Sequence, residues 1–359
     1  LERAGYVVDL VGGAIVTADL ELAQGRLRNA QLVYERGLER ATAAAQTVLR
    51  GAPDMHLGLS DVTYERGDLV SADDHLAAAE RFGEELAFPR FPYRSRLARA
   101  RILQARGDVD GALGQLAAAE RLYRTDFSPD IRPIPLVRAR MLAAHGRLAE
   151  ARASLRASGV DLALEATYFH EFRLLTLARV LAAEGSGPDA VAIAGRLLPA
   201  AEAGNRGGSI LEILVVDALS RHEDGNVDGA LASLDRALTI AEPEGYVRLF
   251  LDEGPAMTEI LKIGAKRRTA PAYLHQVLAA AAGTTSVRAP RAPGLVEPLS
   301  DRELEVLRLL QSELDGPEMA NELVVSLNTL RTHTKNIYAK LGVSSRRAAV
   351  RRAAELDLL

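Results

Sequence analysis

The sequence predicts an all-α chain in which a long helical-repeat solenoid is followed by a small four-helix unit. A glycine-containing hexapeptide recurs at intervals of 38 to 42 residues. The composition is 48% hydrophobic but only 4% aromatic, with no Trp and no Cys. From residue 299 onward the charge pattern and the hydrophobic period both change. Ala- and Leu-rich segments of this kind favour helices packed on helices over an aromatic sheet core.

The repeated pattern is Gly, any residue, an aliphatic residue, any two residues and Ala. Its copies are GRLRNA at 25, GDLVSA at 67, GDVDGA at 107, GRLAEA at 146, a degenerate GPDAVA at 187 and GNVDGA at 225. Seven residues before each Gly stands a small or slender side chain: Ala18, Ser60, Ala100, Ala139, Val180 and Ala218. A glycine turn next to small residues lets two antiparallel helices approach closely. Each copy therefore predicts one helix pair.

This pattern resembles the tetratricopeptide-type helical repeat, with longer helices than its usual unit. In such repeats each pair packs against its neighbours, which predicts a curved solenoid with a long concave surface. We assign residues 1–282 to this domain. The segment EPEGYVRLFLDEG at 242–254 departs from the repeat, so we expect it to cap the stack, and a further helix is expected near 272–282.

Residues 283–298 read GTTSVRAPRAPGLVEP. Three prolines, two glycines and the lack of periodicity are typical of a linker. The charge changes after it, because residues 297–326 hold eight acids and two bases whereas residues 327–359 hold seven bases and two acids. The overall net charge of −4 hides this local basic segment.

Residues 299–359 predict four helices. Ser300 and Glu303 form a capping box before a leucine-rich stripe that ends near Gln311. Pro317 suits the first turn of a short second helix. A third helix is expected within 325–343, and a fourth from 346 to about 356. The tight turn between the second and third helices predicts a helix-turn-helix.

The third helix has two faces. Placing residues about 100° apart puts Leu330, Ile337 and Leu341 on one side. The opposite side holds polar and cationic residues: Asn328, Arg331, Thr332 and Lys335. Taken alone, this segment also fits an ordinary amphipathic surface helix.

Three stretches of residues 299–359 resemble the LuxR-type DNA-binding domain: LSDRELEVLRLL, MANELVVSLNTLRTHTKNIYAKLGV and SRRAAV. The resemblance implies that the third helix enters the major groove of double-stranded DNA and that the fourth contributes to a homodimer. By position, the base-facing residues are Arg331, Thr332 and Lys335. The residues near phosphates are Ser326, Asn328, Thr329, His333, Asn336 and Arg347, and Arg346 completes the candidate set. Thr334 departs from the family, which often has an aliphatic residue there.

The whole chain is similar to the C-terminal part of the large ATP-dependent LuxR-family regulators, the MalT-like group. The chain begins at Leu1 inside a helical pattern, so we expect a nucleotide-binding domain upstream. The resemblance implies a transcriptional regulator whose solenoid senses an inducer or a protein partner.

Two other classes of protein remain as alternatives. A helical-repeat interaction scaffold whose last helices only dimerise would not need the cations Arg331 and Lys335. An enzyme is least favoured, because no Gly precedes a Lys as a P-loop requires and no Cys nucleophile exists. We expect no cofactor and no metal, since the seven histidines are scattered without metal-ligand spacing. No apolar run approaches the roughly 18 residues of a membrane helix, and we expect a cytoplasmic protein.

Overall fold

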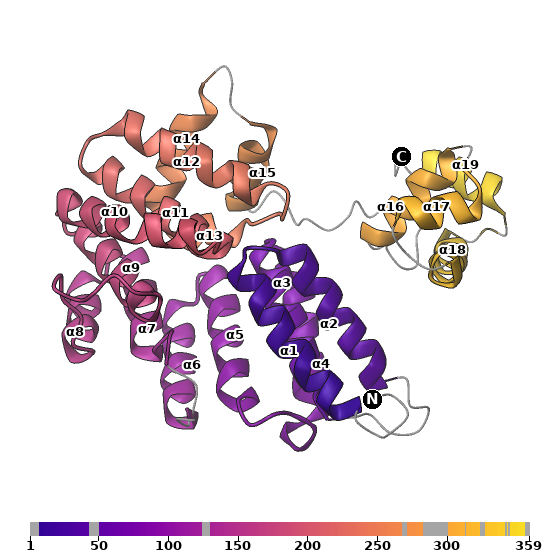
Figure 1. Cartoon of the computed structure of the whole chain (residues 1–359), viewed down its shortest axis with the longest axis horizontal. Helices are drawn as coiled ribbons and strands as arrows, with labels where there is room; N and C mark the ends of the chain where they lie inside the picture. The colour runs from indigo at the N-terminus through magenta and orange to yellow at the C-terminus, as the bar shows by residue number, and fades with distance from the viewer. Residues whose placement is uncertain are drawn as a thin grey trace. The chain divides into compact units, whose positions relative to one another are not determined.

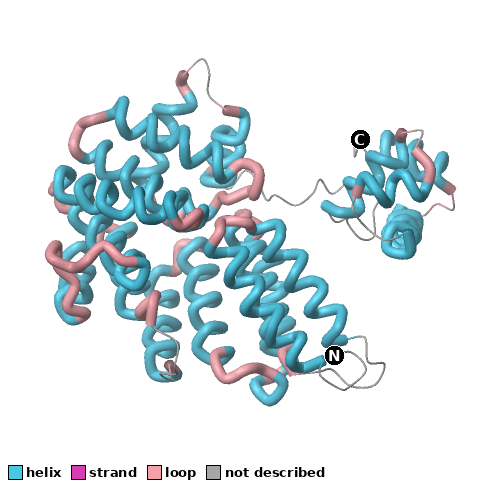
Figure 2. The backbone as a smooth tube through the Cα atoms, in the orientation of Figure 1, coloured by secondary structure: helices cyan, strands magenta, loops and turns pink. Residues whose placement is uncertain are grey.

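The computed structural model describes residues 7–42, 50–123, 130–267, 271–282, 301–312, 314–323, 327–341, 343 and 345–355. These residues form helices and connecting turns, and no β-strand occurs among them (Figures 1 and 2). The chain divides into two compact units, Leu1–Thr284 and Thr285–Leu359. The linker expected at 283–298 lies outside the described residues.

The first unit is a series of antiparallel helix pairs followed by shorter helices (Figure 1). The pairs are α1 (Val7–Ala23) with α2 (Leu27–Thr42), α3 (Ala52–Glu65) with α4 (Leu69–Phe82), α5 (Phe91–Ala105) with α6 (Val109–Leu122), α7 (Ile134–Ala144) with α8 (Leu148–Ala157), α9 (Tyr168–Ala183) with α10 (Gly187–Ala203), and α11 (Gly207–Glu223) with α12 (Val227–Ala241). The shorter helices are α13 (Arg248–Leu251), α14 (Pro255–Ala265) and α15 (Ala272–Ala281).

The glycines of the repeat make the turns within the pairs. Gly67, Gly107 and Gly225 have φ values of 81°, 85° and 75°, a left-handed conformation that ends the first helix of each pair. The residue after each of these glycines, Asp68, Asp108 and Asn226 respectively, accepts a hydrogen bond from a backbone N–H of the second helix. The predicted repeat is thus confirmed in these pairs.

The degenerate copy was placed two residues too late. Gly187 is the first residue of α10, whereas the turn glycine with φ of 83° is Gly185. Counted from Gly185, the neighbouring intervals become 39 and 40 residues. The small residue seven positions earlier is then the fully buried Ala178 instead of Val180. The copy that starts at Gly185 also keeps the final Ala of the pattern, the fully buried Ala190, and departs from it only at the aliphatic position, where Gly187 stands.

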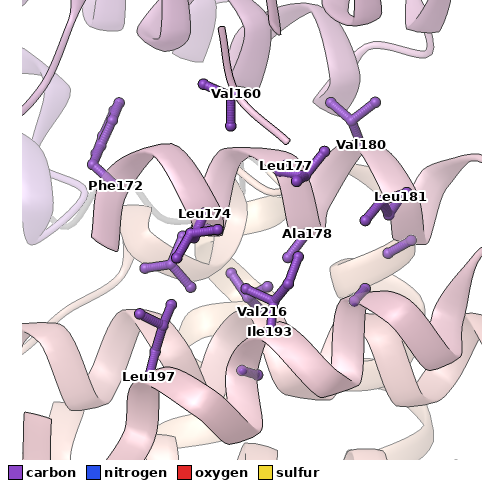
Figure 3. Close-up of a cluster of buried hydrophobic side chains, with 14 of the residues drawn as sticks. Val160, Phe172, Leu174, Leu177, Ala178, Val180, Leu181, Ile193, Leu197 and Val216 are labelled. Atoms are coloured by element: carbon purple, nitrogen blue, oxygen red, sulfur yellow. The ribbon is translucent and has the colours of Figure 1, made fainter. Parts of the chain in front are cut away.

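The core of the middle repeats is formed by aliphatic side chains of α7 to α11 together with Phe172 (Figure 3). In the sequence, YFHEFR at 168–173 places Tyr168, Phe169 and Phe172 together, which predicts core packing first and a ligand pocket second. Phe172 does so, but Tyr168 and Phe169 are 39% and 54% exposed. The prediction of core packing is therefore wrong for these two residues, which are the first two residues of α9 and are exposed to solvent.

Two histidines that are far apart in the sequence meet between α3 and α4. The Nδ1 atoms of His56 and His75 lie 3.1 Å apart, and Phe82 stacks on the His56 ring. The sequence spacing gives no sign of this contact, and no group of three or more metal-ligating side chains occurs in the described part of the chain. Burial, His75 and Arg81 lower the pKa of His56 to about 4. Burial also lowers the pKa of His75.

This pair predicts a loss of stability in mild acid. Both imidazoles bind protons more readily in the unfolded chain, so their contribution is complete above about pH 6.5 and is lost as the pH falls toward 4. We expect the urea midpoint of the chain to fall between pH 7 and pH 5. His56→Phe should reduce this dependence, because it removes one titrating ring. An equal pH dependence in the variant would contradict the assignment.

The solenoid also departs from the simple stack that was predicted. Repeats were expected to contact their neighbours alone, yet α1 packs against α11 and α13 packs against α3. Leu27, at the start of α2, is fully buried in a cluster with Leu211, Leu214 and Phe250. Figure 2 shows the first and last repeats of this unit side by side. The segment 242–254 therefore contacts the first repeats as well as the last.

The second unit contains α16 (Asp301–Gln311), α17 (Gly316–Glu322), α18 (Leu327–Leu341) and α19 (Arg346–Glu355). Their bounds agree with the four predicted helices. The apolar core joins all four helices and includes Val306, Leu307, Met319, Leu330, Ile337, Leu341, Ala349 and Ala353. Across the described residues of both units, no helix combines the length and the hydropathy needed to cross a membrane.

Candidate nucleic-acid interface

Helix α18 separates its packing residues from its polar residues as the periodicity predicts. Leu330, Ile337 and Leu341 are 3%, 0% and 5% exposed. The opposite face is exposed and carries Arg331, Thr332, Lys335 and Asn336, with His333 half-buried beside them. Ser326 lies outside the described residues, and the side chains of Asn328 and Thr329 are not described.

Thr334 stands on α18 at a position where the LuxR-type family often has an aliphatic residue. The side chain is half-buried, and its hydroxyl donates a hydrogen bond of 2.8 Å to the carbonyl of Leu330. A threonine that bonds to the preceding turn leaves no donor unsatisfied. The departure from the family pattern is therefore accommodated within α18 itself.

Arg346 and Arg347 have different surroundings at the start of α19. The Arg346 guanidinium donates to the carbonyls of Leu310 and Leu314 at 2.8 and 2.7 Å, and also to those of Leu309 and Ser312. Leu309 and Leu310 lie in the last turn of α16, where carbonyls lack an N–H partner four residues further along the helix, and Ser312 and Leu314 follow the helix. Arg346 thus caps α16 and joins it to α19, whereas Arg347 is exposed.

A buried ion pair joins α16 to α18. The Lys340 ammonium lies 2.9 Å from a Glu303 carboxylate oxygen, and the two side chains are 18% and 5% exposed. The sequence predicts that Glu303 is the capping partner of Ser300, which lies outside the described residues, and Lys340 is one of several basic residues in 327–359. The sequence does hold a signal for this ion pair, because Glu303 lies within a leucine stripe and Lys340 lies on the packing side of α18, and buried charges are usually paired.

A capping box that the sequence analysis missed begins the helix-turn-helix. The Glu318 N–H donates to the Asp315 carboxylate at 2.9 Å, and the Asp315 N–H donates to the Glu318 carboxylate at 2.8 Å. The spacing Asp-x-x-Glu ahead of α17 is the sequence signature of this arrangement. It fixes the start of α17, the helix that packs against α18.

Exposed charges differ between the helices of this unit. Asp315, Glu318 and Glu322, at and within α17, are exposed acids. Four exposed cations lie on α18 and α19, namely Arg331, Lys335, Arg347 and Arg351, and α16 carries the exposed Arg308. Exposed arginines and lysines gathered on neighbouring helices attract the phosphates of nucleic acid.

A helical-repeat solenoid joined to a helix-turn-helix unit with a cationic second helix defines a LuxR-type regulatory protein. Residues 297–353 match the family described as bacterial regulatory proteins of the luxR family. Residues 2–267 match the family described as the MalT-like TPR region. The chain belongs to this MalT-like family.

Individual relatives agree with the family assignment. The chain is 30% identical over 154 residues to the HTH-type transcriptional regulator MalT of Klebsiella pneumoniae, a match that covers 37% of this chain and 17% of that protein. It is 30% identical over 151 residues to the regulator of the same name from Yersinia pestis, covering 35% of this chain and 16% of that protein. The matched region thus spans about a sixth of the length of these relatives.

Proposed function

We propose that this chain regulates transcription by binding double-stranded DNA in a sequence-specific manner. The observation that carries the proposal is the exposed polar face of α18, which lies opposite a buried face of Leu330, Ile337 and Leu341. A helix of this kind fits the major groove when it is the second helix of a helix-turn-helix.

The exposed residues fall into two groups, according to whether their side chains suit base edges or phosphates of DNA. Arg331, Thr332 and Lys335 are assigned to base edges, because arginine and lysine recognise guanine and threonine contacts several bases. His333, Asn336 and Arg347 are assigned to phosphates, which position the protein. Ser326, Asn328 and Thr329 join the phosphate set by position alone. Arg346 is left out, since its guanidinium is bound to the end of α16.

Two further parts of the proposal concern assembly and sensing. A homodimer on DNA would place two α18 helices on half-sites about 10 base pairs apart, with α19 in the dimer contact. The MalT-like match over 2–267 supports a solenoid that senses an inducer or a protein partner. Transcription control of this type places the protein in the cytoplasm. An interaction scaffold with a C-terminal dimerisation unit is the alternative, and it requires no affinity for DNA.

The test of base and phosphate contacts uses three alanine variants of exposed arginines. Arg331→Ala should relax the preference at one base pair per half-site, at a cost of about 1–3 kcal/mol of discrimination. Arg347→Ala should weaken binding to all sequences alike and reduce the salt slope by about one unit. Arg308→Ala on α16 is the matched control and should change neither quantity. Binding is measured against a pool of genomic fragments at two salt concentrations.

Three results would count against the proposal. Absence of DNA binding by the full chain favours the scaffold alternative. Uniform loss of affinity in both Arg331→Ala and Arg347→Ala, with unchanged sequence preference, removes Arg331 from the base-reading set. Protection of a single unpaired half-site in a footprint removes the homodimer.

A further inference from the structure

We infer that the solenoid is a ring closed at one seam, and that it opens at this seam while its helix pairs stay folded. On one side the seam consists of residues 22–28 and 64–67, from the α1–α2 turn and the end of α3. On the other side it consists of residues 207–208 and 244–252, from the start of α11 and the segment around α13. The two sides are far apart in the sequence, so the contact between them closes the chain of repeats.

The first part of the seam is a direct contact between backbones. Gly25 makes the turn between α1 and α2 with φ of 76°. A Cβ atom added to Gly208 would lie 2.7 Å from the Leu22 carbonyl oxygen, and one added to Gly25 would lie 2.9 Å from the Gly208 nitrogen. Neither distance leaves room for a methyl group. The turn and the helix start therefore fit together because both are glycine.

The second part of the seam joins the end of α3 to the segment around α13. The Val247 N–H donates to the Glu65 carbonyl at 2.7 Å. The Tyr64 hydroxyl donates to the Asp252 carboxylate at 2.9 Å. Val247 precedes α13 and Glu65 is the last residue of α3, so neither backbone group has a hydrogen-bond partner within its own helix. The bond between them supplies that partner.

A glutamate adds two more bonds across the same seam. The Glu244 carboxylate accepts from the Arg28 N–H at 2.9 Å, and the Glu244 carbonyl accepts from the Arg66 guanidinium at 3.4 Å. Arg28 and Arg66 belong to the first two helix pairs, whereas Glu244 follows α12. Both connections bypass every intervening repeat.

The seam differs chemically from the interfaces inside and between helix pairs. The pairs are held by apolar clusters, whereas the seam combines glycine backbone contacts and polar bonds with a smaller apolar part, in which Leu22 and Leu27 pack on the cluster of the last repeats and Val247 lies against Gly67. Tyr246 and Phe250 are buried with the last repeats, where Tyr273 donates to the Tyr246 carbonyl. When the seam opens, water replaces its hydrogen bonds at a small net cost in free energy. Exposing apolar surface to water has no such compensation. We therefore place the opening at the seam, whose polar bonds water can replace.

Closure gives the solenoid two states, which differ in the polar groups that can bind a ligand at the seam. In the closed ring, Tyr64 and Asp252 bind each other and Arg248 lies over the Tyr64 ring, with its guanidinium carbon 5.4 Å from the ring centroid. In the open form the Tyr64 hydroxyl on one side, and the Asp252–Arg248 pair on the other, lose these partners across the seam and can bind a ligand. The seam is thus a conformational device built into the fold, and it acts independently of the DNA-binding proposal.

The test compares two glycine-to-alanine variants of the full chain by hydrogen exchange and mass spectrometry. Gly208 and Gly195 both lie in helices, and neither has a positive φ. Alanine is the better helix former at both positions, but a Cβ on Gly195 meets nothing within 4 Å. We expect Gly208→Ala to speed exchange in peptides covering 244–252 by about tenfold or more. Peptides from α5 and α6 should keep their protection, and Gly195→Ala should leave the seam unchanged.

A second variant tests the contact between the end of α3 and the segment around α13. Tyr64→Phe removes the hydroxyl that binds Asp252 and should speed exchange in the same peptides by a smaller factor. Unchanged protection of 244–252 in Gly208→Ala overturns the inference, because the ring would then tolerate a side chain at the contact. Faster exchange throughout the first unit also overturns it, because the seam would then not open separately from the repeats.

Discussion

Glu303→Ala should destabilise the C-terminal unit by about 3–5 kcal/mol. The substitution removes the carboxylate that lies 2.9 Å from the Lys340 ammonium, in a site where the lysine side chain is only 18% exposed. Partial access to water places the expected cost near the lower end of that range. The chain contains no Trp, so Trp introduced for the half-buried Tyr338 reports unfolding of this unit alone. Urea titration of its fluorescence gives the free energy of unfolding.

A double variant separates the ion pair from the space that the side chain fills. Glu303→Ala combined with Lys340→Met removes both charges, so no uncompensated charge remains buried. We expect the double variant to regain part of the lost stability, because replacing a buried ion pair by apolar groups is often neutral. Glu322→Ala, at an exposed position on α17, should have little effect. Equal midpoints for the single and double variants would assign the loss to packing instead of charge.

The elements of this fold that could be predicted from sequence are those set by neighbouring residues. The turn glycines and the Asp or Asn that follows them specify where one helix ends and the next begins. The faces of α18 follow from a period of 3.6 residues, which is why Leu330 and Ile337 are buried while Arg331 is exposed. The shift from Gly187 to Gly185 shows the limit of pattern matching when two glycines lie close together.

The contacts that could not be predicted join residues distant in the sequence. Arg346 was grouped with the DNA contacts because it is basic and adjacent to Arg347, yet it binds carbonyls in and just after α16 that lie 32 to 37 residues away. The meeting of His56 with His75 depends on the rotation of α3 against α4, which periodicity does not specify. Closure of the ring requires the curvature of all the repeats together. The roles assigned to Ser326, Asn328 and Thr329 stay predictions.

The curvature of the repeats also brings together a buried network of charged side chains. We expect a substitution in this network to cause a large loss of stability. The Arg179 guanidinium lies 2.9 Å from the Glu253 carboxylate and 3.2 Å from the Glu212 carboxylate, and the three side chains are 7%, 10% and 11% exposed. Arg140 also binds Glu212, and its guanidinium carbon lies 3.5 Å from the centroid of the Phe172 ring. The network links α7, α9 and α11 to the residues that follow α13.

The same network determines how this part of the solenoid responds to strong acid. Burial alone would raise the pKa of the Glu212 carboxyl, but Arg140 and Arg179 lower it to about 2. A lowered pKa means that the contribution of Glu212 is present above about pH 4.5 and is lost as the pH falls toward 2. Glu212→Gln should therefore flatten the stability of the chain over this acid range, relative to the unchanged protein.

Arg179→Met should lower the free energy of unfolding of the first unit by about 3–5 kcal/mol, because it leaves Glu212 and Glu253 buried with fewer cations. The matched control is Arg236→Met, which breaks a 2.8 Å ion pair with Glu202 whose side chains are 55% and 46% exposed. An exposed pair contributes about 0–1 kcal/mol, so the control should change stability little. Urea denaturation followed by far-ultraviolet circular dichroism compares the two variants. Similar midpoints would mean that water reaches the Arg179 network and that burial does not strengthen it. A large difference would identify this network as a main polar connection between the middle repeats and the segment that closes the ring.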